Sequence, residues 1–422
     1  MTSAGPALVV AVHDGFYGCG TGAGSSNRAF LRVLREVLDP SVQLTVLPVR
    51  LAPDSAEYDA AWYQESLTLT GSAGAGIIPI DNGTGGQSRF GGLANFQLAS
   101  AGAAAEITRI LNRASLALAV AFDAPFFGTA LALAPRHAAR TVNVARATAA
   151  LHAPEDRERI NWERRGLLAT ARAGGRVAAT SRHIRRHLTA AYGIPPQAIT
   201  DLINGLTPGE ERPGPTRGAA SLLPSAATQR FMLSYGRAEP YKGFDDLLSA
   251  LSILRHDGAQ VPHTVLGAVS DGPPLTSYQR HLADRIAAGE LDVTLHTTFT
   301  PALRGLLADP RLAAVIVPSR AEPFGRIPLE AYAAGASPVV ATTAGGLADT
   351  VTENRTGYTA RPADPPSLAR AISRALAATP AQRQRLLAAG QARTRARFDY
   401  HANVAAFLKA AAPWATGNPQ SA

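Results

Sequence analysis

The sequence predicts an α/β protein built from two doubly wound domains. Short runs rich in Val, Ile and Leu alternate with longer stretches of helical period in both halves of the chain. Such alternation is typical of parallel sheets covered by helices on both faces. Residues 206–229, rich in Pro, Gly, Ser and charge, interrupt the pattern and predict a linker. At 422 residues the chain is also too long for one ordinary core.

The first domain is expected to cover residues 1–205 and to open with a strand at 7–13. Apolar periodicity predicts the elements that follow it in order. They are a helix at 26–38, a strand at 42–51, a helix at 105–114, a strand at 116–123 and a short strand at 176–181.

The second domain is expected to cover residues 230–396 and to repeat the same alternation. A strand, a turn and a helix are predicted over 231–254, and further strands at 263–272, 291–299, 312–319 and 337–343. An amphipathic helical segment at 397–415 is expected to end the fold. In such sheets, ligands bind outside the carboxyl ends of the strands.

The composition of the chain limits the classes of partner that the protein is expected to bind. The formal charge of +9 comes from basic residues spread singly along helix-like stretches, with no interleaved aromatic platform. We therefore expect no nucleic-acid partner and no membrane association. Cys19 is the one cysteine, which excludes an intramolecular disulfide and a cysteine-based zinc cluster. The opening residues lack a basic signal region, and the longest apolar stretch, 115–134, is broken by Asp123 and Pro125, so a cytoplasmic location is expected.

A glycine-rich turn follows the first strand in "HDGFYGCGTGAGSSNRAFLRVL". Such a turn before a helix brings backbone N–H groups close to an anion, although a purely structural turn is the alternative. A dinucleotide fingerprint would need a carboxylate where the second strand ends. Arg50 lies there and no carboxylate precedes Asp54, so NAD is disfavoured. An NADP-dependent oxidoreductase stays open, because an arginine can accommodate a 2′-phosphate.

The stretch "PSRAEPFGRIPLEAYAAG" carries two glutamates, Glu322 and Glu330, separated by seven residues. Pro328 suits the first position of a helix and Gly335 the residue just past its end. This places Glu330 in the first helical turn and Glu322 in the loop before it. A carboxylate there accepts hydrogen bonds from vicinal hydroxyls, while the helix N-terminus favours phosphate. Sugar and phosphate together indicate a nucleotide sugar; a carboxylate that only stabilises the helix dipole is the structural alternative.

This stretch resembles the E-x7-E motif of the retaining GT-B glycosyltransferases, the family of glycogen synthases and bacterial mannosyl- and N-acetylglucosaminyltransferases. "GRAEPYKGFDDLLSAL" looks like the family's diphosphate-binding Arg…Lys-Gly element, and "SPVVATTAGGLADTVTENRTGYTARPADPPSLARAI" is similar to the segment after the second Glu. "AVHDGFYGCGTGAGSSNRAFLRVL" and "ATSRHIRRHLTAAYGIPPQAITDLINGL" match the start and end of the N-terminal domain. The resemblance implies two Rossmann-like domains facing a central cleft, with a C-terminal helix returning toward the N-terminal domain.

The resemblance also implies roles for individual residues. Arg237 and Lys242 would neutralise the donor diphosphate as catalytic residues, together with Glu322, which would hold the donor sugar. Glu330 would bind the ribose. The remaining donor-binding residues implied are Gly22, Gly24, Ser25 and Asn27 of the glycine turn, meeting the diphosphate when the domains close, and Phe324, Gly325, Arg326 and Ile327.

Acceptor and sugar contacts are expected from the N-terminal domain. His13 and Asp123 stand at the ends of two predicted strands. Relatives often carry a sugar-supporting His after the strand that corresponds to 140–152. Here Arg146 stands at that place and His152 follows six residues later, and either could serve. The segment 78–96, dense in Gly, Asn, Ser and Gln, is expected to meet the acceptor or else to be a surface loop.

The function implied is retaining transfer of a sugar from a nucleoside-diphosphate donor, UDP first and GDP second, to a small polar acceptor. Bacterial specialised-metabolite (antibiotic-like) biosynthesis is the expected setting. The chain has no Asp-x-Asp donor-metal motif, so no metal is expected. No cofactor is expected either, because the nucleotide sugar is a substrate. The alternative from another functional class is a protein that binds a nucleotide sugar without turning it over. The sequence predicts no oligomeric state.

Overall fold

The computed structural model describes residues 5–207, 218–224, 227, 229–270, 274–298, 300, 302–336 and 338–416. The described chain forms two compact units. One comprises the residues up to Asn204 together with those from Tyr400 onward, and the other is Gly205–Asp399. Much of the expected linker, residues 208–217, 225, 226 and 228, lies outside the described residues.

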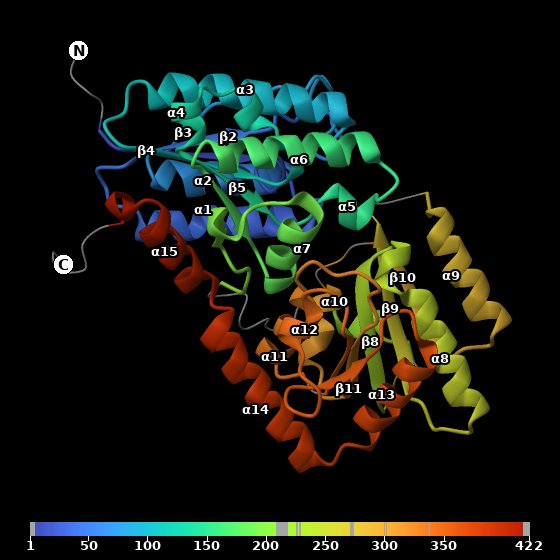
Figure 1. The fold of residues 1–422 in the computed structure, drawn as a ribbon. Helices are drawn as coiled ribbons and strands as arrows, with labels where there is room; N and C mark the ends of the chain where they lie inside the picture. Colours follow the sequence, from blue (N-terminus) through green and yellow to red (C-terminus); the bar gives the residue numbers. More distant parts are fainter. Residues whose placement is uncertain are drawn as a thin grey trace. The chain divides into compact units, whose positions relative to one another are not determined.

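The first unit is built on a seven-stranded sheet in the order β3-β2-β1-β4-β5-β6-β7, with every neighbouring pair parallel (Figure 1). Its strands are β1 Ala7–Val12, β2 Gln43–Pro48, β3 Gly76–Ile77, β4 Ala117–Phe122, β5 Thr141–Ala145, β6 Arg176–Ala179 and β7 Ile199–Asp201. Its helices are α1 Gly22–Val37, α2 Ala60–Ser72, α3 Leu93–Leu111, α4 Pro135–Ala138, α5 Ala149–His152, α6 Arg157–Arg172, α7 Arg182–Tyr192 and α15 Tyr400–Ala411.

The central strand β1 is buried on both faces, as the unbroken run "ALVVAV" predicts. Successive side chains of a strand point to opposite faces. Leu8 and Val10 therefore join the cluster that contains Phe30 of α1, and Val9 joins the opposite cluster with Ile107 of α3. The sheet thus has a helical layer on each side, as expected for a doubly wound domain.

The last helix, α15, packs in the first unit although its residues close the chain. Phe407 lies in the same buried cluster as Phe30 of α1, with their ring centroids 6.5 Å apart. Figure 1 shows α15 running beside α1. The helix begins at Tyr400 rather than at 397, because the preceding helix α14 runs to Arg397.

The second unit repeats the architecture with a six-stranded parallel sheet in the order β10-β9-β8-β11-β12-β13. Its strands are β8 Phe231–Arg237, β9 His263–Ser270, β10 Val293–Thr298, β11 Leu312–Val317, β12 Val339–Thr342 and β13 Tyr358–Ala360. Its helices are α8 Phe244–His256, α9 Ser277–Ala288, α10 Ala302–Gly305, α11 Arg326–Ala333, α12 Leu347–Thr350, α13 Pro365–Ala377 and α14 Pro380–Arg397.

Both sheets reverse their strand order at one point, between β1 and β4 in the first unit and between β8 and β11 in the second. Ligands of doubly wound folds bind at this switch point, outside the carboxyl ends of the strands. His13 follows β1, Asp123 follows β4, and Arg237 ends β8. The fold therefore puts the predicted site residues of each unit at the edge where a ligand is expected.

Several helix starts differ from the prediction. Helix α3 begins at Leu93 rather than at 105, so it takes in the last residues of the segment 78–96. Helix α1 begins at Gly22, so Gly22, Gly24, Ser25 and Asn27 lie in its first turns and not in a loop. The reason is that the Thr21 hydroxyl accepts the N–H of Gly24 at 3.1 Å and caps the helix before the apolar period begins.

Helix α11 begins at Arg326, which makes Pro328 its third residue rather than its first, and Glu330 its fifth. Proline is still tolerated there, because the first four N–H groups of a helix have no partner within it. Gly335 was placed correctly just past the helix end, where it has φ +84°.

Among the helices of the described ranges, none is long and apolar enough to cross a membrane. The same ranges contain no group of three or more His, Cys, Asp or Glu side chains placed to hold a metal ion.

Candidate functional site

In the second unit, Lys242 and Glu322 form a close ion pair, with Nζ 2.6 Å from Oε2. Lys242 ends the short 3₁₀ turn Pro240–Lys242 after β8, and Glu322 lies in the loop between β11 and α11. Burial opposes the charge of Lys242, but the Glu322 carboxylate outweighs it and raises the pKa of the ammonium. Lys242 is therefore a fixed, protonated cation at the switch point of this sheet.

Gly243 lets this turn approach the end of β11. Its φ is +70°, and a Cβ there would lie 2.0 Å from the carbonyl oxygen of Pro318. A larger residue would push the turn, and Lys242 with it, away from the loop that carries Glu322. Arg237, at the exposed end of β8, donates from Nη2 to the Tyr241 hydroxyl at 2.9 Å, so both predicted cations lie on one short segment.

Glu330 is buried in a cluster of hydrogen-bond donors. Its Oε2 accepts from the Tyr235 hydroxyl at 2.8 Å, and its Oε1 lies 3.2 Å from Arg304 Nη2 and 3.3 Å from Arg326 Nε. Burial, together with Glu330, raises the pKa of Tyr235 well above its usual value, so its hydroxyl remains a donor. The carboxylate is thus presented in one orientation by three side chains.

The residues around the start of α11 are packed closely against the rest of the second unit. Gly325 has φ +88°, and a Cβ there would lie 2.6 Å from a methyl carbon of Leu347. The Phe324 ring packs edge-on against Phe398 with centroids 5.7 Å apart. Ile327 is partly buried against the neighbouring cluster, and Arg326 also donates to the Gly205 carbonyl oxygen at 3.1 Å. These contacts fix the loop before α11, and they thereby fix the position of the helix N-terminus near the carboxyl ends of the strands.

In the first unit, residues from three strand ends and from α1 meet in a buried polar cluster. Arg146 Nη1 lies 2.9 Å from Asp123 Oδ2 and also donates to the side-chain oxygen of Asn27. His13 Nδ1 lies 3.8 Å from the same Asp123 oxygen. Burial, the largest effect, lowers the pKa of His13. Four candidate residues are thus brought together, with Arg146 as the cation.

Several atoms of this cluster are buried without a hydrogen-bond partner: His13 Nδ1, Asp123 Oδ1, and Nε and Nη2 of Arg146. They include both donors and acceptors, which is the set that hydroxyl groups can satisfy. Asp123 itself has φ +72° and ψ 179°, a conformation almost confined to glycine. An unsatisfied, strained carboxylate at a strand end is typical of a binding site.

His152 lies apart from this cluster, at the end of α5. It belongs with His183 and His187, whose rings are stacked with centroids 6.3 Å apart, and Thr148 lies 2.8 Å from His187 Nε2. Of the two residues considered for the sugar-supporting position, Arg146 is the one that joins His13 and Asp123.

We expect this histidine group to make stability fall at acid pH. Burial, then His183 and His152, lower the pKa of His187 from 6.5 to about 4. The unfolded chain binds the proton first, so the stabilisation is complete above pH 6.5 and declines as the pH falls toward 4. Allowing for its partial exposure, the free energy of unfolding should drop by about 1 kcal/mol between pH 7 and 5. Urea titrations should show a smaller drop in His187→Gln, but not in His401→Gln.

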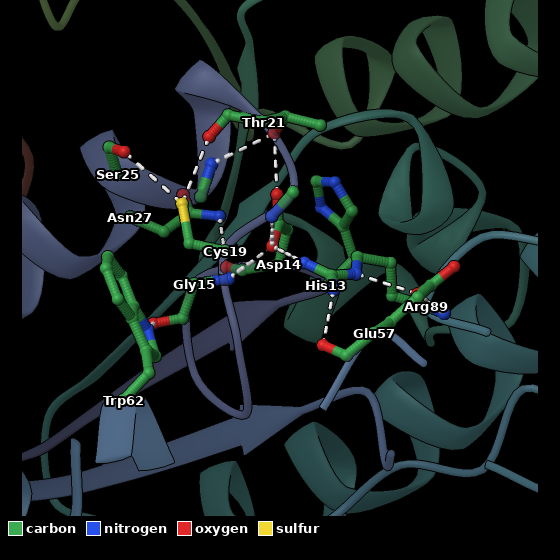
Figure 2. A network of polar contacts seen from close by, with 12 residues as sticks. His13, Asp14, Gly15, Cys19, Thr21, Ser25, Asn27, Glu57, Trp62 and Arg89 are labelled. Atoms are coloured by element: carbon green, nitrogen blue, oxygen red, sulfur yellow. Dashed lines mark hydrogen bonds and ion pairs between the residues drawn. The ribbon is translucent and has the colours of Figure 1, made fainter. Parts of the chain in front are cut away.

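Sequence reasoning missed Asp14, Glu57 and Arg89, which form a partly buried ion network around the glycine-rich turn (Figure 2). It also missed Tyr235 and Arg304 beside Glu330. Asp14 had a usable signal, because it directly follows the strand-end residue His13. The others are distant in sequence from their partners, and no spacing pattern connects them.

Comparison with known families matches residues 223–393 to the family of glycosyl transferases group 1. A D-inositol 3-phosphate glycosyltransferase of Thermobispora bispora is 30% identical over 233 residues, which is 54% of each chain. The corresponding enzyme of Geodermatophilus obscurus is 31% identical over 261 residues, covering 61% of this chain and 56% of its own. The chain thus spans about half the length of the curated relatives it matches.

Solved structures share the fold over nearly the whole chain. The sucrose-phosphate synthase of Thermosynechococcus elongatus superimposes with a TM-score of 0.72 at 19% identity, covering 96% of this chain and 98% of its own. Anabaena HepE, in complex with UDP and glucose, gives a TM-score of 0.69 at 20% identity over 96% and 98%. Residues 223–393 thus match the model of glycosyl transferases group 1, and the chain shares its two-sheet α/β fold with these solved structures.

Proposed function

We propose that the protein is a retaining glycosyltransferase that moves a sugar from a nucleoside-diphosphate donor to a small polar acceptor. The observation that carries the proposal is the pairing of Lys242 with Glu322 beside the donor-rich cluster of Glu330, at the switch point of the matched unit. UDP is the first donor nucleotide to test, because a neighbour of the same fold was crystallised with UDP-glucose. GDP is the second.

The second unit offers the diphosphate two cations. Lys242 is held protonated by Glu322, and Arg237 stands on the same turn. Positioned cations stabilise the negative charge that develops as the diphosphate leaves. When the donor is bound, its phosphate oxygens would compete with Glu322 for the ammonium, and the freed carboxylate could accept hydrogen bonds from the sugar hydroxyls. We propose that these two cations meet the diphosphate charge without a metal ion.

Glu330 would accept a hydrogen bond from the ribose. A carboxylate has about four acceptor positions. The donors from Tyr235, Arg304 and Arg326 occupy three of them, so one remains free. A second ribose hydroxyl could bind only if one arginine moved, and the Arg304 side chain, 36% exposed, has the room to do so.

The acceptor and the transferred sugar would be held by the first unit, through the unsatisfied atoms of His13, Asp123 and Arg146. Two of the curated relatives carry the name D-inositol 3-phosphate glycosyltransferase. Phosphorylated polyols therefore come first in an acceptor panel, followed by small polar metabolites of the antibiotic-like class. Configuration at the anomeric carbon of the product, read by NMR, tests retention, and activity in a chelator tests independence of metal.

Thermal-shift measurements with UDP, GDP, ADP and NADPH test the donor site first. A ligand at a hundred times its dissociation constant should add about 2.7 kcal/mol to the free energy of unfolding and raise Tm visibly. We expect one nucleoside diphosphate to do so in the wild type. Glu330→Gln should lose most of that shift, because it weakens both the ribose contact and the arginine pairs.

Glu353→Gln is the matched control: this glutamate, in the loop before β13, also pairs with an arginine of the second unit, Arg374 of α13 at 3.1 Å. Its shift with the nucleotide should equal the wild type's. A shift with NADPH alone, unaffected by Glu330→Gln, would instead support an oxidoreductase. If the protein bound the nucleotide but formed no product with any acceptor, the alternative of a binding protein without turnover would be supported.

A further inference from the structure

The glycine-rich turn is held from inside by Asp14, as Figure 2 shows. Asp14 Oδ1 accepts the backbone N–H of Gly15 at 2.8 Å and of Gly20 at 3.2 Å, and Oδ2 accepts the Thr21 hydroxyl at 2.6 Å. Thr21 in turn caps α1 through the N–H of Gly24. One carboxylate therefore fixes both ends of the turn and the start of the helix.

Asp14 is itself held by Arg89, which comes from the polar segment 78–96. Arg89 Nη1 pairs with Asp14 Oδ1, while Nε lies 2.8 Å from Glu57 Oε2 and Nη2 donates to the Glu57 carbonyl oxygen at 2.7 Å. The backbone N–H of Arg89 donates to the same carboxylate at 2.8 Å. Because Glu57 accepts from two nitrogens of the Arg89 guanidinium, that group has a single orientation toward Asp14.

The Arg89–Asp14 pair of this network is buried and closely packed, while the Glu57 side chain is 32% exposed. The Arg89 side chain is 4% exposed and that of Asp14 is fully buried. A Cβ on Gly20 would lie 3.2 Å from Arg89 Nη1, and one on Gly24 would lie 2.5 Å from Asp14 Cγ. The turn thus packs directly on the ion pair, and a shift of the pair would shift the backbone N–H groups of the turn. Without Arg89, Asp14 would be a buried carboxylate with no cation beside it.

We propose that Arg89 is a positioning residue, which sets the place of the glycine-rich turn through Asp14 and joins it to the polar segment 78–96. It touches neither donor nor acceptor in this scheme. It acts by holding the start of α1, whose remaining N–H groups would meet an anion, since those of Gly15, Gly20 and Gly24 are already accepted within the network. The ligand half of the inference, that this anion is the donor diphosphate, rests on the proposed function.

Hydrogen exchange of the full chain tests the positioning directly. In Arg89→Lys the charge remains but the fork to Glu57 is lost, so the peptide covering 14–24 should exchange at least tenfold faster, with the rest of the first unit unchanged. The Kd for UDP, or for GDP if the wild type binds that instead, should rise about tenfold. Glu57→Gln, which keeps the shape of the network, should show the same pattern more weakly and serves if Arg89→Lys does not fold.

Arg164→Lys is the control, because this partly buried arginine of α6 donates to the Ala191 carbonyl oxygen at 2.9 Å, away from the turn. Unchanged exchange at 14–24 in the Arg89 and Glu57 variants would overturn the proposal. Faster exchange with an unchanged Kd would show that the turn does not contact the diphosphate and would overturn the ligand half alone. If the wild type binds no nucleoside diphosphate, the proposed function fails with that half, while exchange still decides the positioning role.

Discussion

Replacing Lys242 by Met should lower kcat/KM for sugar transfer by about 100- to 1,000-fold, the range seen when one preorganised donor to a developing negative charge is removed. The ammonium is held 2.6 Å from Glu322, and that carboxylate keeps its pKa raised. The cation is therefore already charged at the switch point, and the diphosphate would displace Glu322 from it on binding, before charge develops on the leaving group. Initial rates of nucleotide release, with and without acceptor, measure the effect.

The chain supplies a close control for this substitution in Lys409, an exposed lysine near the end of α15. Lys409→Met should leave kcat/KM within twofold of the wild type. Lys242→Arg should retain more activity than Lys242→Met, because the charge remains while the geometry changes. If Lys242→Met kept more than a tenth of the wild-type value well below its Tm, the diphosphate role of Lys242 would be wrong.

The fold could be predicted from the sequence because the patterns that indicate it are local along the chain. Continuous apolar strands such as "ALVVAV" and "LAAVIV", each followed by a turn and a helix, are the pattern that parallel sheets require. The structure confirms the two parallel-sheet α/β units. Helix starts were harder to predict, because a capping side chain can begin a helix where the composition suggests a loop. The glycines at 22 and 24 suggested a loop, but the Thr21 side chain caps a helix that begins at Gly22.

The site was accessible only in part. Glu322, Glu330, Arg237 and Lys242 lie close to strand ends in the sequence, so the sheet topology alone brings them to one edge. Arg304 and Arg89 are different, since each reaches its partner across the fold from a separate segment. Such contacts depend on side-chain reach and packing, which leave no periodic trace in a single sequence.

The Asp123–Arg146 pair should have the largest effect on stability. The two side chains are 9% and 7% exposed and 2.9 Å apart. Removing one partner of a buried pair leaves an uncompensated charge and typically costs about 3–5 kcal/mol. Arg146→Met should therefore lower the free energy of unfolding by about that amount, measured by urea denaturation. It should also raise the pKa of His13, since Arg146 is one of the charges that lower it and Asp123 is one that raises it.

A double-mutant cycle separates this charge effect from simple loss of packing. Asp123→Asn with Arg146→Met removes both charges, so it should be less destabilised than the sum of the single variants by about 1–3 kcal/mol. Additive losses would mean that the pair contributes nothing beyond packing. Because Asp123 holds a backbone conformation that favours glycine, Asp123→Gly with Arg146→Met should be more stable than Asp123→Asn with Arg146→Met. Asp123→Asn alone, with Arg146 intact, should lose sugar transfer. Together these outcomes would show that the strained carboxylate is retained for binding rather than for stability.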